Sequence, residues 1–364
     1  MAQKPAVLIT GVSGNLGLRL LEQIPDFHAI GVDVRPPATT QNLVCFENID
    51  LREERSCTQL LKLLRAYRPD AIVHLAFVAP ARSAIADRER MRQANVSGTA
   101  RVLEAIAEHN RILGGISKFI FPSSTMVYGP GAGETFREST RLAAQDPLAS
   151  SAWVSDKIEA DLTIQSWSNG LKCRSYILRC HGMTGTPALT ATAEVASGDS
   201  LIAALRGIAD GEGSIARRRR ERGARTPVFM PAGGTYLDHP FQFVHIDDAA
   251  RLIATIVRRI QTDPQLTILN VAGRDEAIPI HQCAQIANTT IRRVPGKALW
   301  RRVLGLLWDL GVSAVPPETL PYLLGSCVTD NSRLRQFLGD DYREIIRFTC
   351  AEALAASFPA GGIL

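Results

Sequence analysis

The segment SSAWVSDK, residues 150–157, places Lys157 four residues after Trp153. On a helix this spacing puts both side chains on one face, the arrangement of a proton donor beside a lysine that tunes it. The aromatic residue is an indole, however, and its N–H donates a hydrogen bond without ionising near neutral pH. Trp153 and Lys157 are therefore a catalytic pair of unusual type, the remnant of one, or two residues whose spacing is a coincidence. The other motifs of the chain are needed to choose among these interpretations.

A glycine-rich turn near the N-terminus has the spacing GxxGxxG, with Gly11, Gly14 and Gly17. It follows the apolar run at 6–10 and opens the helical pattern at 15–24. The first glycine permits a tight turn, the second lets the backbone approach a pyrophosphate, and the third permits close packing of helix on strand. Because a helix N-terminus also offers free N–H groups to phosphate, the order strand, glycine turn, helix predicts a dinucleotide site.

A carboxylate is placed to select the dinucleotide. Asp33 ends the next apolar run, about twenty residues on, where a ribose-binding acid belongs. It would repel a 2′-phosphate, so we predict NAD rather than NADP, although Arg35 partly offsets that repulsion. Asp50 and Leu51 follow the presumed third strand and are predicted to hold the adenine edge; a helix cap is the alternative interpretation of Asp50.

Short apolar runs alternate with helical patterns through the first half of the chain, which predicts an α/β, Rossmann-type doubly wound parallel sheet. We expect a dinucleotide-binding domain over 1–182, its sheet completed by segments near 241–272. A smaller, mostly helical substrate-binding and lid region follows over 183–364. The expected strands are 6–10, 28–34, 71–77, 118–124, 173–179 and 267–273, and the expected helices are 15–24, 57–67, 94–109 and 153–167.

The segment 183–240 lacks periodicity, and its stretches 183–200 and 211–236 are interpreted as loops. Such segments are typical of functional lids, so we predict that this region closes over substrate. The basic run Arg217–Arg225 lies within it. We interpret the run as a solvated loop, with an anion-binding lid as the alternative.

The bulk composition is that of a globular protein: 364 residues, 46% hydrophobic and 21% charged, with a net charge of +5 that is too small to argue for nucleic acid. The seven cysteines form no CxxC and no cluster with histidine, so we expect reduced thiols, no metal site and a cytoplasmic protein. The N-terminus has no signal-peptide pattern, and no run reaches the roughly 18 apolar residues of a spanning helix. The nearest case, 298–315, is broken by Arg301, Arg302 and Asp309 and is interpreted as an amphipathic helix, so no membrane partner is expected.

Taken together, the motifs resemble the extended short-chain dehydrogenase/reductases, the NAD-dependent epimerase/dehydratase group. The resemblance covers most of the chain. It implies a Rossmann domain, a smaller C-terminal substrate domain and proton transfer by a Tyr and a Lys in YxxxK. It rests on TGVSGNLG (10–17), Asp33, DL (50–51), HLAF (74–77), NVSGT (95–99), FPSSTMVYG (121–129), Lys157, LRCHGMTG (178–185), FVHIDDAA (243–250) and NVAG (270–273).

Carried over by position, the resemblance implies three catalytic positions. Ser124 would hold the substrate oxygen, Lys157 the nicotinamide ribose, and Trp153 stands where the family has its tyrosine. Asn95 would support the central helix, and His74 is interpreted as a core histidine. The residues expected to bind the cofactor are Gly11, Ser13, Gly14, Asn15, Leu16, Gly17, Asp33, Arg35, Asp50, Leu51, Leu75, Ala76, Asn95 and Lys157.

The missing tyrosine leaves three hypotheses, because losing a general acid/base typically costs about 10²–10⁴-fold in rate. The first is an active oxidoreductase, epimerase or dehydratase that uses a substrate group, a water relayed by Ser124, or Tyr128. The second is a dinucleotide-binding sensor or scaffold, and the third is a nucleic-acid or membrane module. Retention of Ser124 and Lys157 favours the first, and loss of the tyrosine favours the second.

The substrate is a small molecule whose class the motifs leave open. Family members acting on nucleotide sugars commonly carry an arginine just before the segment matching FVHIDD, where this chain has Phe241 and Gln242. The arginines of 217–225 are an alternative source of charge, and a hydrophobic hydroxyl or keto compound is an alternative substrate. A homodimer through two helices, one of them 153–167, is expected by analogy.

Overall fold

A seven-stranded parallel sheet forms one half of the chain, in the order β12-β7-β5-β4-β1-β2-β3. The computed structural model describes residues 4–40, 42–78, 87–143, 151–186, 200–260 and 262–358. The sheet confirms the predicted Rossmann-type fold, and its edge strand β12 comes from the 241–272 region, as expected. The strands are β1 (Ala6–Thr10), β2 (His28–Asp33), β3 (Leu43–Asn48), β4 (Ala71–His74), β5 (Lys118–Ser124), β7 (Arg174–Cys180) and β12 (Leu266–Val271).

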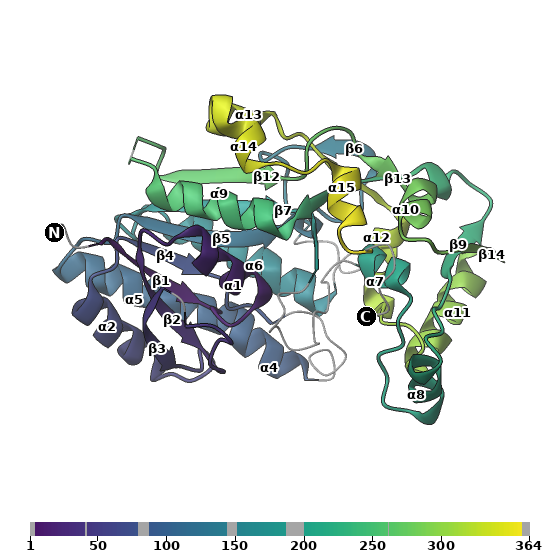
Figure 1. Cartoon of the computed structure of the whole chain (residues 1–364), viewed down its shortest axis with the longest axis horizontal. Coiled ribbons are helices and arrows are strands. Elements are labelled where there is room, and N and C mark those ends of the chain that lie inside the picture. Colours follow the sequence, from purple (N-terminus) through teal and green to yellow (C-terminus); the bar gives the residue numbers. More distant parts are fainter. Residues whose placement is uncertain are drawn as a thin grey trace.

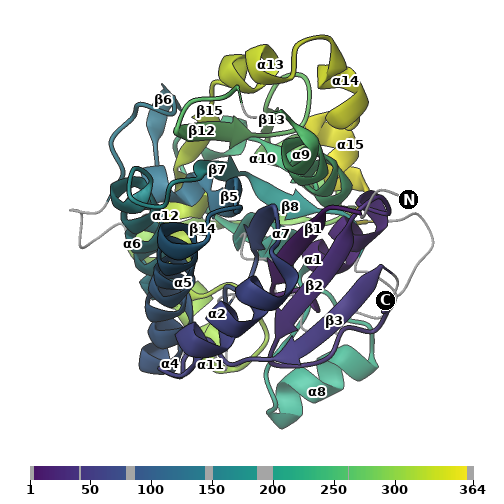
Figure 2. The same cartoon turned by 90° about the vertical axis from the view of Figure 1, so that its left-hand side faces the viewer.

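Helices cover both faces of this sheet because its strands are apolar on both sides. One core packs α1 (Asn15–Gln23) and α9 (Ile246–Arg258) on the sheet through residues such as Leu20 and Ile253. The other core packs α2 (Ser56–Tyr67), α5 (Gly98–Ile112) and α6 (Ala152–Trp167) on the opposite face. Figure 2 shows these two groups of helices on either side of the sheet. A short α4 (Arg88–Arg92) and a π-helical turn η1 (Gln93–Ser97) lead into α5.

The other half of the chain is a mostly helical lobe with its own core around the fully buried Trp300. Figure 1 shows α7, α8, α10 and α11 with β9 and β14 at the end of the molecule away from β1–β4. Its elements are α7 (Ser200–Arg206), α8 (Ser214–Glu221), β9 (Val228–Ala232), η3 (Tyr236–Asp238), β13 (Ile278–Pro279), α10 (Ile280–Ile286), β14 (Ile291–Pro295), α11 (Lys297–Asp309), η4 (Pro317–Thr319) and α12 (Leu320–Leu324).

Short strands and helices join the two halves. β15 pairs with β6 and β10, and β8 pairs with β11. The joining elements are η2 (Thr125–Tyr128), β6 (Ala132–Phe136), β8 (Gly182–Thr184), β10 (Pro240–Phe241), β11 (Phe243–His245), β15 (Ser326–Thr329), α13 (Ser332–Leu338), η5 (Gly339–Asp341), α14 (Tyr342–Ile345) and α15 (Cys350–Ala355).

The prediction that 211–236 is a loop was wrong, because α8 and β9 lie within it. Arg220 donates to the carbonyls of Ala209 and Gly211 at 3.1 and 2.6 Å, and Arg225 donates to four further carbonyls, so these arginines satisfy backbone acceptors instead of repelling one another. Residues 187–199 of the expected lid, 183–240, lie outside the described residues, and its closure over substrate stays a prediction. The prediction of a helix near 298–315 is confirmed by α11.

A buried ion pair ties α6 to the sheet. Asp161 on α6 accepts two hydrogen bonds from Arg179 on β7, both at 3.0 Å, and one from Ser123 Oγ on β5 at 2.8 Å. Both charged side chains are almost fully buried, at 2% and 0% exposed. Removing either partner leaves an uncompensated buried charge.

We therefore expect Arg179→Met to lower the free energy of unfolding by about 3–5 kcal/mol, because it leaves the Asp161 carboxylate buried without its cationic partner. Urea denaturation measures the change. Arg111→Gln, which breaks the exposed pair with Glu108 on α5, is the control and should cost at most about 1 kcal/mol. Equal, small losses in both variants would contradict this account of the pair.

Candidate functional site

The glycine turn has the geometry of a phosphate cradle. Gly11 has φ +73°, and a Cβ there would lie 2.5 Å from the backbone nitrogen of Ala76, so the turn touches the end of β4. A Cβ on Gly17 would lie 2.5 Å from the Val12 carbonyl oxygen. Gly14 precedes α1 and provides no side-chain cap, and a Cβ there would approach only Gly11 O, at 3.3 Å. The space beside Gly14, at the start of α1, is therefore open, as a pyrophosphate bound at the helix N-terminus requires.

Asp33 is held at the mouth of this cradle. Its Oδ2 accepts from the Ser13 amide at 3.0 Å, its Oδ1 accepts from the Val34 amide at 2.7 Å, and Ser13 Oγ donates to the Arg35 carbonyl at 2.5 Å. A carboxylate has about four acceptor positions, so those left over suit two ribose hydroxyls. The Arg35 side chain lies exposed beside it. These residues fit the adenosine end of NAD.

The Asp50 carboxylate pairs with Arg52 and also accepts from the Arg52 amide at 3.0 Å. The Arg52 guanidinium lowers the pKa of Asp50. Leu51 is buried against Gly98. Asp50 therefore caps a turn and not a helix, because α2 begins after Arg55, and a role at the adenine edge stays a prediction.

Two buried polar side chains lie at the end of β4 and in the segment that follows it. Asn95 Oδ1 accepts from the Val78 amide at 2.7 Å, and its Nδ2 donates to Asp156 on α6 at 3.2 Å. His74 lies between the hydroxyls of Thr10 and Thr99, at 2.6 and 3.0 Å, and burial lowers its pKa to about 3. His74 is therefore a neutral core residue, in agreement with its interpretation from the sequence.

Lys157 lies in a box of aromatic rings. Its Nζ donates to the Pro122 carbonyl at 3.0 Å and lies 3.5 Å from the Phe77 ring centroid, 4.6 Å from that of Phe121 and 5.9 Å from that of Trp153. The rings favour the ammonium form, whereas complete burial opposes it and lowers the pKa of Lys157 to about 7. The lysine is thus poised between its two protonation states near neutral pH.

Trp153 lies on the same side of α6 as Lys157. Its side chain packs edge-to-face on Phe77, with centroids 6.2 Å apart, and the residue is only 8% exposed. Its Nε1–H is buried and has no hydrogen-bond partner among the described residues. Buried donors without a partner are uncommon in folded proteins, so this one calls for an explanation.

Ser124 ends β5, and its Oγ accepts from the Met126 amide at 3.2 Å, which caps η2. That bond leaves the hydroxyl hydrogen free to donate. Tyr128 is different. Its hydroxyl donates to Asn270 Oδ1 at 2.6 Å and accepts from Arg179 at 3.0 Å, and burial raises its pKa to about 12. These contacts occupy the hydroxyl and argue against Tyr128 as the substitute proton donor.

Phe77 is the last residue of HLAF, but the sequence did not predict that its ring would contact Lys157. Asp156 on α6 was also not singled out from the sequence; it is buried and accepts a hydrogen bond from Asn95, and burial raises its pKa to about 6. No helix of the described residues is long and apolar enough to cross a membrane. The described parts of the chain hold no group of three or more His, Cys, Asp or Glu side chains arranged for a metal ion.

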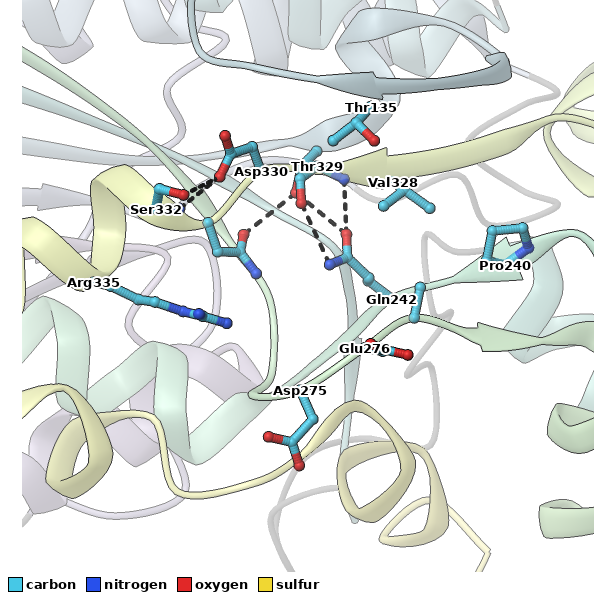
Figure 3. A pocket seen from close by; sticks show the side chains of 12 residues that line it. Thr135, Pro240, Gln242, Asp275, Glu276, Val328, Thr329, Asp330, Ser332 and Arg335 are labelled. Atoms are coloured by element: carbon cyan, nitrogen blue, oxygen red, sulfur yellow. Dashed lines mark hydrogen bonds between the residues drawn. The ribbon is translucent and has the colours of Figure 1, made fainter.

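A separate cavity of about 460 Å³ is lined by residues of β15 and of segments around it (Figure 3). Gln242 and Thr329 form its hydrogen-bonded floor, with Thr329 N donating to Gln242 Oε1 at 2.8 Å. Carboxylates of Asp275, Glu276 and Asp330 and the Arg335 guanidinium line it. It contains none of the predicted site residues, and its lining comes from segments distant in the chain.

A glycine turn between β1 and α1, a carboxylate at the end of β2 and a lysine on α6 are arranged as in a dinucleotide-binding fold. The family model for the NAD dependent epimerase/dehydratase family matches residues 7–272. The chain belongs to this family.

The named proteins to which the chain is similar include sugar-nucleotide epimerases. The chain is 23% identical over 321 residues to the dTDP-L-rhamnose 4-epimerase of Burkholderia thailandensis, covering 77% of this chain and 79% of that protein. Over 172 residues, 43% of this chain and 40% of the relative, it is 28% identical to UDP-glucose 4-epimerase 2 of Oryza sativa subsp. japonica.

Solved structures share the fold. The UDP-glucose 4-epimerase of Thermus thermophilus, in complex with NAD, has a TM-score of 0.64 at 17% identity, with 97% of both chains covered. A dTDP-glucose 4,6-dehydratase from Streptomyces venezuelae with NAD bound also scores 0.64, at 19% identity, covering 97% of this chain and 95% of the other.

We predict that the chain binds NAD(H) more tightly than NADP(H), because a 2′-phosphate would meet the Asp33 carboxylate. Calorimetry with both cofactors measures the preference. Asp33→Asn should reduce the preference for NAD(H), because it removes the charge that repels the 2′-phosphate. Asp309→Asn, at an exposed position on α11, should leave the preference unchanged. Equal or tighter binding of NADP(H) to the wild type would show that Arg35 outweighs Asp33.

The pKa of Lys157 gives a pH signature of stability. Its folded value of about 7 lies below the unfolded value of about 10.4, so between them only the unfolded chain binds the proton. The free energy of unfolding must therefore rise with pH from about 7 towards 10, by up to about 1.4 kcal/mol per pH unit. In Lys157→Met this rise in the free energy of unfolding should vanish. In Lys62→Met, at an exposed position on α2, the rise should persist. If the free energy of unfolding depends on pH in the same way in the wild type and in both variants, the account of Lys157 burial is contradicted.

Proposed function

We propose that the chain is an NAD-dependent enzyme of the epimerase and dehydratase type that acts on a hydroxyl- or keto-bearing carbon of a sugar nucleotide. The observation that carries the proposal is the turn Gly11–Gly17, pressed against β4 and joined through Ser13 to Asp33. It fits a dinucleotide, and Lys157 lies on α6 beside the strand end that carries Ser124. Family membership supplies the reaction class.

The chain's own residues have distinct roles in this proposal. Bound NAD would supply reversible hydride transfer. The N–H groups of α1 would hold its pyrophosphate, Asp33 its adenosine ribose, and Lys157 its nicotinamide ribose. The Ser124 hydroxyl would donate to the substrate oxygen, and the indole N–H of Trp153 would orient the same group without moving a proton.

The sugar-nucleotide part rests on the named relatives, which act on dTDP- and UDP-sugars. Phe241 and Gln242 are both 7% exposed, and Phe241 packs in the core of the helical lobe. Positive charge for a pyrophosphate must therefore come from elsewhere. Arg217, Arg218 and Arg222 of the α8 region are exposed and are candidates.

We also propose a cytoplasmic homodimer that contacts through α5 and α6. These helices pack beside each other, and Ile112 and Leu162 on them are exposed, at 50% and 43%. Two such helices from each protomer would bury apolar surface that the single chain leaves in water.

Trp153→Tyr tests the proposal. The new phenol would lie beside a buried lysine that lowers its pKa, so we expect at least about a tenfold faster reduction of bound NAD by UDP-glucose or dTDP-glucose, measured as NADH absorbance. Trp167→Tyr, at the other end of α6, is the control and should leave the rate unchanged. If the wild type binds NAD but neither sugar nucleotide, the proposed substrate class is wrong and the chain is a dinucleotide-binding sensor or scaffold.

A further inference from the structure

The cavity beside β15 contains a buried amide group that the protein leaves without a partner. Asn331 lines the cavity and is only 7% exposed. Its Oδ1 accepts one long hydrogen bond, from Thr329 Oγ1 at 3.4 Å, and its Nδ2 has no hydrogen-bond partner among the described residues. An amide nitrogen carries two donors, and polar groups of buried residues are rarely left unpaired. Asn331 therefore points to a ligand that accepts hydrogen bonds in the cavity.

The floor around Asn331 is held in place before any ligand arrives. Gln242 is also 7% exposed, and its Oε1 accepts from the Thr329 amide at 2.8 Å. Because that amide can only donate, this bond fixes which end of the Gln242 side chain is oxygen. The remaining nitrogen, Nε2, makes only a 3.4 Å contact with the Thr329 carbonyl. Behind the floor, Thr329 Oγ1 lies 2.8 Å from Nε2 of His181, which burial keeps neutral by lowering its pKa to about 3.

The charged groups of the lining are also incompletely paired. Asp275 and Glu276, between β12 and β13, line the cavity and make no hydrogen bond or ion pair with any described residue. The same is true of the guanidinium of Arg335 on α13. Asp330 differs, because its carboxylate accepts from the Ser332 amide at 2.8 Å and from the Ser332 hydroxyl at 2.5 Å. Figure 3 shows the unpaired carboxylates and the guanidinium around one space.

These features restrict the class of ligand. The volume of about 460 Å³ lies in the range of about 300–1,000 Å³ that is typical of small-molecule sites. A metal ion does not suit the lining, because the described parts of the chain hold no group of three or more His, Cys, Asp or Glu side chains that could bind one. The lining residues include no aromatic ring on which a sugar could stack. The complementary ligand is an organic molecule that carries both kinds of charge.

We propose that this cavity binds a small basic zwitterion, a molecule with ammonium groups and one carboxylate, for which L-lysine is the probe. The ammonium groups would bind the carboxylates of Asp275 and Glu276. The carboxylate would bind the Arg335 guanidinium and the Nδ2–H groups of Asn331. The cavity is a second ligand site, separate from the dinucleotide cradle, and it does not depend on the proposed function.

Calorimetry with L-lysine tests the site directly. We expect one molecule to bind the wild type with a Kd below about 1 mM. L-norleucine has the same carbon chain and carboxylate but no side-chain ammonium, and cadaverine has both ammonium groups but no carboxylate. Each should bind at least about tenfold more weakly, since a hydrogen-bonded charge is lost.

Two variants assign the binding to the cavity. Glu276→Gln and Arg335→Gln should each weaken the binding of L-lysine by at least about tenfold, because each removes one charge and keeps most of the side chain. Arg333→Gln is the matched control, since Arg333 is exposed on the same helix and does not line the cavity. Both cavity variants should keep the NAD affinity of the wild type, which shows that they are folded. Asp33→Asn should keep the affinity for L-lysine.

Nuclear magnetic resonance locates the ligand. The side-chain amide signals of Asn331, assigned by their loss in Asn331→Asp, should shift when L-lysine is added.

The proposal is overturned if L-lysine does not bind the wild type, or if it binds Glu276→Gln and Arg335→Gln as tightly as the wild type. An unchanged Asn331 signal at saturating L-lysine would also overturn it. Binding of D-glucose or of calcium chloride in place of L-lysine would show that the ligand class is wrong. Each readout is binding and not turnover, so a failure of the proposed function leaves the result of this test unaffected.

Discussion

The buried ion pair between Arg179 and Asp161 is the interaction on which the site depends. Burying two charges is costly, and here the cost is offset because Asp161 is hydrogen-bonded to Arg179, Ser123 and Gln165. Arg179 also holds Tyr128 and the Glu138 carbonyl. The pair fixes α6 against β5 and β7 one turn after Lys157. With the helix fixed in this rotation, Lys157 and Trp153 must face the end of β5.

The parts of the fold that the sequence predicts are those with local causes. The turn from β1 into α1 needs glycines at set positions, and Asp33 must end β2, so both are visible in a short stretch of sequence. The shared face of Trp153 and Lys157 likewise follows from helical spacing alone. These expectations required no knowledge of distant contacts.

Contacts between distant segments could not be predicted in this way. Phe77 covers Lys157 only because the segment after β4 meets α6. Tyr322 on α12 donates to the Met126 carbonyl only because the helical lobe folds back on η2. The run Arg217–Arg225 was interpreted from its charge as a solvated loop. In the structure Arg220 donates to the backbone carbonyls of Ala209 and Gly211. The cavity at Gln242 and Thr329 is assembled in the same way, from strands and loops that no single motif connects.

The alternation of side chains along β5 limits how this protein can change over evolutionary time. Ser123 points to the α6 face and donates to Asp161, while the next residue, Ser124, caps η2. β5 is paired on both sides, with β4 and β7, so an inserted or deleted residue within it would exchange the faces of every following side chain. It would remove the support of α6 and the serine at the strand end in one event. Lineages of this protein should therefore accumulate length changes in connecting loops, while the number of residues in β5 stays constant.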